Sequence, residues 1–333
     1  MSSEVNKTNG TVAFVVVSWN NQKLLKDCLE SIKRQDYQDI KIILVDNNSN
    51  DTTIDYLRES FPEVRVLPQT QNHGFAKGNN IGIKEALADT KVKFVALLNT
   101  DARLDSNWTT TLVNATLIRP KSATLQSITL DFYDHNIIDS THIYIAHNGQ
   151  GTQGSWRIPL AEDHEVPPMK IFGCNAAAML ITRSFIEAQP FKDFFDETMF
   201  MYLEDVDVAT RATVMGWDNY LVPGTRAYHM GSASSSKNPS FSLYMTFRNN
   251  LGLLIKNLPF PILLTVLWRL PGADRASIKH LKRLKKDSGI PAIYKGRIVS
   301  LMYIAIFVIK RLKLNKHREV NNSYLWHLMR RGF

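Results

Sequence analysis

A short segment near residue 100 places a carboxylate where it could bind a ligand. Phe94–Leu98 is an apolar run of strand length, and Asn99, Thr100 and Asp101 follow it directly. The apolar run cannot stabilise the charge of Asp101, so this carboxylate needs water, a partner or a metal ion. Beside a diphosphate, a divalent cation held by oxygen ligands is the simplest partner. Taken alone, the segment favours a strand followed by a turn that Asp101 caps.

Two further segments contain side chains suited to a nucleotide. Asp46 ends the apolar run Ile40–Val45, and its carboxylate could accept a hydrogen bond from the ring N–H of uracil or thymine, although a turn or cap also favours Asp. Asn72–Asn80 is a glycine-bearing stretch that we predict as a loop leading into a helix. Such a loop can bind phosphate, but its spacing matches neither the dinucleotide fingerprint nor the P-loop. A phosphate site and a plain capped loop both remain open.

An acidic cluster and a histidine complete this set of polar residues. Glu204, Asp205 and Asp207 fall on one predicted helical turn. Because Glu204 and Asp205 are adjacent and point in different directions, one could act as a general base while hydrogen bonds hold the other. Asp207 can pair with Arg211 four residues later, and an acidic first turn also favours the helix dipole. His229 could ligate a metal, although a lone histidine is more often a hydrogen-bonded structural residue.

The surrounding sequence predicts strands that alternate with helices. We expect strands over residues 11–18, 40–45, 64–67 and 94–98, and helices over 22–35, 52–60, 78–87 and 200–215. This alternation indicates a parallel sheet with crossover helices, whose carboxyl strand ends would bring Ser18, Asp46 and Asp101 to one crevice. Residues 130–168 are poorly periodic, which is typical of loops and irregular strands. Ile171–Thr182 returns to an apolar, strand-like character.

Charge is distributed unevenly along the 333 residues. Residues 251–333 contain 17 Lys and Arg but 3 Asp and Glu, a net charge of +14, whereas residues 1–250 have a net charge of −5. This asymmetry suggests an anionic partner, either a membrane or a nucleic acid. The basic residues alternate with long aliphatic side chains rather than with aromatic ones that stack on bases, which argues against nucleic acid. The two cysteines and the polar N-terminus indicate a reducing compartment and no secretory signal.

The apolar stretches of this basic tail are poor candidates for membrane spans. Ile298–Ile309 holds 12 residues, about 18 Å of helix, which is too short for a hydrocarbon core of about 30 Å. Leu251–Leu270 is interrupted by Lys256, Pro259 and Pro261. Both stretches suit segments that lie in the plane of a membrane, with Lys and Arg at anionic headgroups. A buried helical hairpin or a homo-oligomer interface is the alternative.

In combination, these segments resemble family 2 glycosyltransferases of GT-A fold, particularly the rhamnosyltransferase-like group. The matching stretches are VVVSWN at 15–20, ILVDNNSND at 43–51, QNHGFAKGNNIG at 71–82, ALLNTD at 96–101, FDETMFMYLEDVDVATR at 195–211, AYHMGSASSS at 227–236 and Arg248-Asn249. The resemblance implies a Rossmann-like, mostly parallel α/β sheet flanked by helices. Residues 1–250 would form the catalytic domain, and residues 251–333 a basic amphipathic helical extension for membrane association or oligomerisation.

The resemblance also implies a reaction and roles for individual residues. It indicates inverting transfer of a sugar from a nucleotide-diphosphate donor, with Mg²⁺ or Mn²⁺ as cofactor. Asp46 would read the pyrimidine base, Asp205 would act as the base, and Asp101, the last acid of the D-x-D motif, would bind the metal with His229. Asn99 departs from the family, because many relatives carry Asp there; its amide oxygen can ligate but brings no charge.

The expected site is therefore a set of residues contributed by most of the chain. The catalytic pair is Asp205 and Glu204; the nucleotide and donor residues are Ser18, Asn20, Asp46, Asn72, Gly74, Phe75, Lys77, Gly78, Asn79, Asn99, Thr100 and Asp101; the metal ligands are Asp101 and His229; and the acceptor region contains Gly173, Cys174 and Arg248.

The resemblance favours L-rhamnose from dTDP-rhamnose, with UDP-sugars next. The acceptor would be a hydroxyl of a glycan or polyprenyl-diphosphate-linked intermediate of cell-surface glycan synthesis, and the enzyme would be cytoplasmic and peripheral on the inner face of the membrane. A non-catalytic sugar-nucleotide-binding protein and a nucleotidyltransferase are the alternatives. Retention of both Asp101 and Asp205 argues against the first, and the contexts of Asp205 and His229 fit the second less well.

Overall fold

The N-terminal half forms a parallel sheet with crossover helices. The structure is a computed structural model that describes residues 10–160, 167–231 and 238–329. The strands are β1 (Thr11–Ser18), β2 (Ile40–Asp46), β3 (Arg65–Pro68) and β4 (Val92–Leu98), and the helices are α1 (Gln22–Lys33), α2 (Thr53–Ser60) and α3 (Gly74–Leu87). They pair in parallel in the order β4-β1-β2-β3, as the alternating pattern predicts, and each predicted strand lies within two residues of an observed one.

The second half extends the same sheet with mixed pairing. Its elements are β5 (Ala102–Leu104), α4 (Trp108–Leu117), β6 (Ser122–Asp131), β7 (Ile137–Ser140), β8 (His142–Ile145), β9 (Gly151–Gly154), β10 (Ile158–Pro159), β11 (Met169–Ile171), β12 (Ala178–Thr182), α5 (Arg183–Glu187), α6 (Glu204–Val214) and β13 (Asp218–His229). β12 lies antiparallel between β4 and β6, so the main path runs β10-β7-β6-β12-β4-β1-β2-β3. β13 runs parallel to β6 and antiparallel to β5 and β11. β8 and β9 pair separately.

Three predicted boundaries are wrong for local reasons. The helix expected from residue 78 begins at Gly74, so much of the predicted glycine-bearing loop is its first turns. The helix expected from residue 200 begins at Glu204, because Phe200, Tyr202 and Leu203 have positive φ angles. The apolar run 171–182 is divided between β11 and β12, with a loop at residues 172–177. Apolar periodicity does not reveal these backbone turns.

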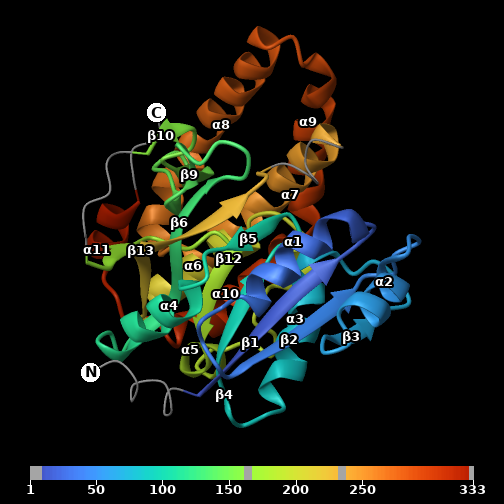
Figure 1. Cartoon of the computed structure of the whole chain (residues 1–333). Coiled ribbons are helices and arrows are strands. Elements are labelled where there is room, and N and C mark those ends of the chain that lie inside the picture. The colour runs from blue at the N-terminus through green and yellow to red at the C-terminus, as the bar shows by residue number, and fades with distance from the viewer. Residues whose placement is uncertain (1–9, 161–166, 232–237, 330–333) are drawn as a thin grey trace.

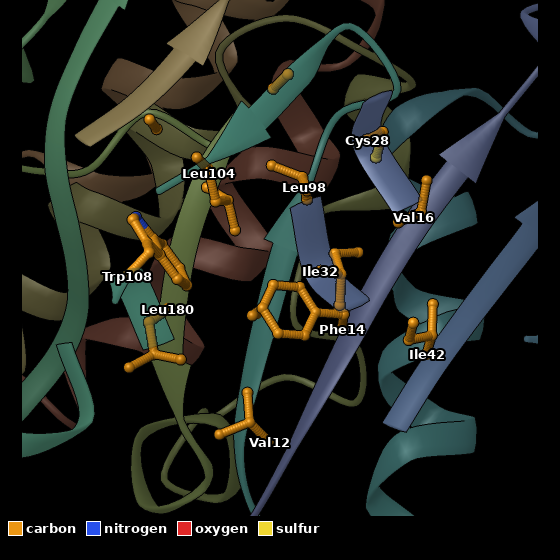
Figure 2. Close-up of a cluster of buried hydrophobic side chains, with 14 of the residues drawn as sticks. Val12, Phe14, Val16, Cys28, Ile32, Ile42, Leu98, Leu104, Trp108 and Leu180 are labelled. Atoms are coloured by element: carbon orange, nitrogen blue, oxygen red, sulfur yellow. The ribbon is translucent and has the colours of Figure 1, made fainter. Parts of the chain in front are cut away.

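The core lies on both faces of the sheet. On one face, alternate residues of β1 such as Phe14 pack beneath α1 and against Trp108 of α4, whose ring centroid is 6.1 Å from that of Phe14. Figure 2 shows this cluster extending to Ile32 and Leu180. Trp108 is fully buried and its Nε1 donates to Ser127 Oγ at 3.1 Å. This packing fixes the strands whose carboxyl ends carry the candidate site.

The C-terminal region is helical. It consists of α7 (Pro239–Asn257), α8 (Phe260–Arg283), α9 (Ile290–Met302), α10 (Ile304–Asn315) and α11 (Asn322–Leu328). α7 is continuous through residue 250 and joins the tail to the body, while α8 and α9 form a hairpin that projects from it (Figure 1). Among the described helices, none is long and apolar enough on its own to span a membrane. The bent pair 287–302 and 304–315, with an angle of 61°, meets the length and composition test only jointly.

Candidate active site

Buried polar atoms gather where β1 and β2 end. Ser18 and Asp46 are partners in the parallel register, and Asn47 follows. All three are at most 2% exposed, yet Ser18 Oγ, Asp46 Oδ1 and Asn47 Oδ1 have no hydrogen-bond partner within the described residues. Asp46 Oδ2 accepts from the Ser49 amide at 3.1 Å. Because buried polar atoms are normally satisfied, these three indicate a place for a polar ligand.

Asn20 connects the two loops that follow these strands. Its φ is 52°, its backbone N–H donates to Ser49 Oγ at 2.9 Å, and its Oδ1 accepts from the Asn50 amide at 2.7 Å. The side chain is exposed. Asn20 therefore joins the loops after β1 and β2 on their exposed side and is not one of the buried residues at the strand ends.

The N-terminus of α3 faces this strand edge, but two of its amides are already in use. The Gly74 N–H donates to Asn72 Oδ1 at 2.8 Å, and the Ala76 N–H donates to the Phe200 carbonyl at 3.0 Å. Asn47 Nδ2 in turn donates to the Gly74 carbonyl at 3.0 Å. A Cβ on Gly74, whose φ is +74°, would lie 2.6 Å from Phe200. The first turn is thus packed against protein, which leaves fewer donors for phosphate than an open loop would.

The other predicted residues of α3 have mainly packing contacts. A Cβ on Gly78 would lie 2.8 Å from Val17, so the glycine lets α3 approach β1. Asn79 is buried and donates to the Phe75 carbonyl at 3.0 Å. Phe75 packs edge-on against Phe195, with ring centroids 5.9 Å apart. Lys77 is half-buried in the first turn of α3 and is the lysine nearest to the N-terminus of this helix.

Asp101 and His229 come together at the end of β4 and β13. His229 Nε2 lies 3.4 Å from Asp101 Oδ1, and the Met230 N–H donates to the Asp101 carbonyl at 3.0 Å. Asp101 is 8% exposed. Thr100 accepts from Asn21 Nδ2 at 3.4 Å. The two carboxylates that contact His229, at Asp101 and Asp139, raise its pKa to about 9 despite the opposing effect of burial.

These residues fit a hard divalent cation that is shared with a diphosphate. Mg²⁺ usually takes one or two protein carboxylates, water and substrate phosphate oxygens rather than a closed protein cage. Among the described residues no group of three or more His, Cys, Asp or Glu forms such a cage. Asp101 and His229 would hold the ion, and the half-buried Asn99 lies two residues from Asp101.

Glu204 and Asp205 open α6 and differ in environment. Glu204 is 7% exposed and its Oε2 has no partner within the described residues. Asp205 is half-buried and its Oδ1 accepts from the Val206 N–H at 2.8 Å. Burial raises the pKa of both, that of Glu204 to about 8 and that of Asp205 to about 6. Near neutral pH, Asp205 is therefore the ionised and more accessible carboxylate of the pair.

The loop between β11 and β12 brings Asp205 close to the end of β4. The backbone amide of Ala176 is close enough to the Asp205 carboxylate to lower its pKa, while the carbonyl of the next residue, Ala177, accepts from the Asn99 N–H at 2.9 Å. Two consecutive peptide units thus join the catalytic candidate to the segment that carries Asp101. This bridge assembles the site from segments about a hundred residues apart.

Two of the residues expected to contact an acceptor, Gly173 and Cys174, lie in this loop, and the third, Arg248, lies on α7. A Cβ on Gly173 would lie 2.1 Å from the Ala209 Cβ, so Gly173 permits the loop to pack on α6. Cys174 is 1% exposed, and burial raises the pKa of its thiol to about 12. Arg248 on α7 donates to Asn249 Oδ1 at 2.9 Å and stacks on Tyr303 with its guanidinium carbon 4.4 Å from the ring centre. Only backbone packing places Gly173 and Cys174 near the site.

Sequence reasoning placed Asn249 in a matching pair of residues but gave it no role in holding residues 199–203, the turn before α6 that we call the catalytic turn. Asn249 Nδ2 lies 2.8–2.9 Å from the carbonyls of Met199, Met201 and Tyr202, in the stretch with positive φ angles before α6. Sequence reasoning also missed Asp139, whose Oδ2 lies 2.9 Å from His229 Nδ1. Asp139 sits in β7, a strand within the poorly periodic stretch. An acidic residue inside the apolar run IIDS was the one available signal.

The comparison with known proteins places the chain in a family. Residues 13–187, more than half of the chain, match the model for glycosyl transferase family 2. The chain belongs to this family, and its mixed sheet flanked by helices is the GT-A fold of glycosyltransferases. A solved mannosyltransferase, PcManGT from Pyrobaculum calidifontis in complex with GDP-Man and Mn²⁺, is similar in fold with a TM-score of 0.54; it is 17% identical, with 92% of this chain and 86% of that chain covered.

Three relatives found by sequence match parts of the chain. The N-acetylglucosaminyl-diphospho-decaprenol L-rhamnosyltransferase of Mycobacterium tuberculosis is 23% identical over 245 residues, covering 69% of this chain and 79% of the relative. Glycosyltransferase GlyG of Streptococcus pneumoniae is 35% identical over 104 residues, 30% of this chain, and the match spans 33% of that relative. A Campylobacter jejuni glucosyltransferase named for a PP-undecaprenol substrate is 28% identical over 102 residues, covering 31% of this chain and 33% of the relative.

Proposed function

We propose that this glycosyltransferase inverts the anomeric centre of a nucleotide-diphosphate sugar, with Asp205 as the general base. The observation that supports this role is the loop before β12, whose Ala176 amide lies near the half-buried Asp205 and whose Ala177 carbonyl accepts from Asn99 in the segment carrying Asp101. Asp205 takes the proton of an acceptor hydroxyl while that oxygen forms a bond to the anomeric carbon. The bond from this carbon to the diphosphate breaks, and its electron pair leaves with the diphosphate. No enzyme nucleophile is needed for direct displacement.

The donor would lie across the strand ends. Asp46 Oδ1 is a buried acceptor without a partner in the described residues, suited to the single ring N–H of uracil or thymine, and Asn47 Oδ1 is a second such acceptor beside it. Lys77 and the start of α3 would face the diphosphate. Asp101 and His229 would hold Mg²⁺ or Mn²⁺, which supplies charge stabilisation to the leaving diphosphate. Asn99 would contribute an uncharged oxygen.

For the substrates, we propose dTDP-rhamnose as donor and a glycan hydroxyl, carried on a polyprenyl diphosphate, as acceptor in cell-surface glycan synthesis. The 245-residue similarity to a rhamnosyltransferase named for a diphospho-decaprenol acceptor supports this choice. A UDP-sugar is the alternative donor. Asp46 is compatible with both, because uracil and thymine present the same ring N–H.

A lipid-linked acceptor suggests a place for the tail, residues 251–333, on the inner face of the cell membrane. Phe260, Leu264 and Trp268 form a stripe on α8 that is 52–88% exposed, while Ile262, Leu263 and Val266 on its other side are buried. Basic residues crowd the C-terminal end of the same helix. An exposed apolar stripe beside cationic side chains matches an anionic bilayer surface.

The test of the transferase proposal is Asp205→Asn. The amide cannot accept the proton, so transfer should fall by at least about 10²–10⁴-fold, whereas donor affinity should change little because Asp205 does not hold the nucleotide. Transfer to a polyprenyl-diphosphate glycan and thermal shift with dTDP- and UDP-sugars, with and without Mn²⁺, measure the two effects. An equal loss of transfer and of donor affinity would show that Asp205 has a different role. Stabilisation by UDP-sugars and not by dTDP-sugars would show that the donor is a UDP-sugar rather than dTDP-rhamnose.

A further inference from the structure

Asp139 occupies a position that no sequence motif indicates. It lies in β7 at 8% exposure, and its Oδ2 is 2.9 Å from His229 Nδ1. The opposite ring nitrogen, Nε2, is 3.4 Å from Asp101 Oδ1. His229 therefore lies between two carboxylates contributed by different strands. Gly231, with a φ of +69°, leaves space for the second oxygen of Asp139, because a Cβ there would come within 3.1 Å of it.

The chemistry of the two partners defines the direction of the hydrogen bond. An ionised carboxylate only accepts, so Nδ1 must carry the proton that faces Asp139. Nε2 is then the nitrogen that faces Asp101. Nε2 and Asp101 Oδ1 lie 3.4 Å apart, so that both atoms could bind one ion.

We infer that Asp139 is a positioning residue that orients His229, so that Nε2 and Asp101 together face the metal bound to the donor diphosphate. The inference rests on the proposed metal site and adds a residue that does not itself touch donor or metal. A carboxylate that accepts from the second nitrogen of a histidine ligand fixes both the tautomer and the orientation of the ring. Asp139 thus connects β7, from the poorly patterned region, to the chemistry at β4 and β13.

The test is Mn²⁺ titration of the dTDP-bound full-length protein by calorimetry, with Asp139→Asn and Asp139→Ala. We expect Mn²⁺ affinity to fall about 10–100-fold in both, with dTDP affinity in the absence of Mn²⁺ unchanged. Asp131→Asn is the matched control, because Asp131 is a nearby carboxylate that pairs with Arg157 and not with the His229 ring. Its Mn²⁺ affinity should stay within about twofold of wild type.

A spectroscopic readout separates positioning from a purely structural role. In ¹⁵N-histidine spectra of the protein with dTDP and Mg²⁺, assigned with His229→Ala, wild-type His229 should show a proton on Nδ1 and none on Nε2, and this pattern should be lost in Asp139→Ala. Folded Asp139 variants with unchanged Mn²⁺ affinity would overturn the inference, as would equal losses of dTDP and Mn²⁺ binding. A wild-type protein that binds dTDP and transfers sugar but binds no Mn²⁺ would overturn it while leaving the transferase proposal in place. Absence of both nucleotide binding and transfer would instead refute the proposed function.

Discussion

The carboxyl groups of Asp205 and its neighbour Glu204 differ in burial and in hydrogen bonding. Glu204 is enclosed, and its Oε2 has no partner within the described residues. Asp205 is half-buried, accepts a hydrogen bond from the Val206 N–H and lies near the Ala176 amide. Both amides favour the ionised form and oppose the desolvation that raises the pKa of Asp205. Near neutral pH, Glu204 thus keeps its proton and Asp205 loses it. The sequence, in which the two acids are adjacent, could not show which of them is ionised.

This difference predicts the pH dependence of transfer. Burial raises the pKa of Asp205 from 3.8 to about 6, and a general base works only when it is deprotonated. We therefore expect kcat/KM to rise about tenfold per pH unit below that pKa and to level off above it. The measurement is a pH–rate profile between pH 4.5 and 8 at saturating Mn²⁺. A profile that is flat between pH 5 and 7 would contradict a base with this raised pKa.

Sequence and structure agree best for residues that end regular elements. Asp46 and Asp101 follow apolar strands, so their place at the carboxyl edge could be predicted from strand length and topology. The role of Asp139 could not be predicted in this way, because it depends on contact with His229, 90 residues away in the sequence. The burial of Asn47 Oδ1 without a hydrogen-bond partner in the described residues likewise depends on contact between β1, β2 and α3. Long-range pairing, rather than local pattern, defines these members of the site.

At the scale of elements, the turn before α6 explains why the predicted helix start was wrong. Apolar residues precede Glu204 at spacing compatible with a helix, yet Phe200, Tyr202 and Leu203 have left-handed backbone conformations. Such conformations are costly for bulky residues and persist only where surrounding contacts determine them. The side chain of Asn249 on α7 supplies those contacts.

Asn249→Ala should therefore reduce activity as well as stability. The substitution removes the donor shared by three carbonyls, and we expect a loss of about 1–3 kcal/mol in the free energy of unfolding. Because the same turn sets the direction of α6, kcat should also fall, by about tenfold or more if Asp205 shifts. Chemical denaturation and transfer kinetics on one preparation measure both quantities.

Asn250→Ala is the matched control for that experiment. Asn250 is also buried on α7, but its Nδ2 donates to the Gly149 carbonyl at 2.7 Å and its Oδ1 accepts from Arg297 at 3.0 Å, and it has no hydrogen bond to the catalytic turn among the described residues. It should lose stability with little change in kcat. If both variants lose kcat to the same extent at equal stability, the effect belongs to α7 in general and not to the turn.

At the scale of the whole molecule, buried charges join the tail to the catalytic body. Lys256 of α7 is 1% exposed, and its Nζ lies 2.8 Å from both Asp196 and Asp207. Lys310 of α10 also pairs with Asp196, and Asp207 lies in α6 beside Arg211, the pair expected from their spacing. Removing one partner of such a network leaves a buried charge uncompensated. Tests of the tail therefore require surface substitutions rather than truncation.

The exposed stripe of α8 provides such substitutions. We expect the full-length protein to float with vesicles containing anionic lipid but not with neutral vesicles, and a Leu264→Glu/Trp268→Glu double variant to lose most of this binding. The reason is that two apolar contacts become two like charges facing anionic headgroups. Trp156→Glu controls for loss of an exposed aromatic elsewhere, since Trp156 is 62% exposed and lies outside the helical tail.

Transfer to a short soluble acceptor should be retained by the double variant, because the stripe lies outside the site. A wild-type protein that stays unbound and instead self-associates, with dissociation on Trp268→Glu, would assign the stripe to a homo-oligomer interface and refute the membrane proposal.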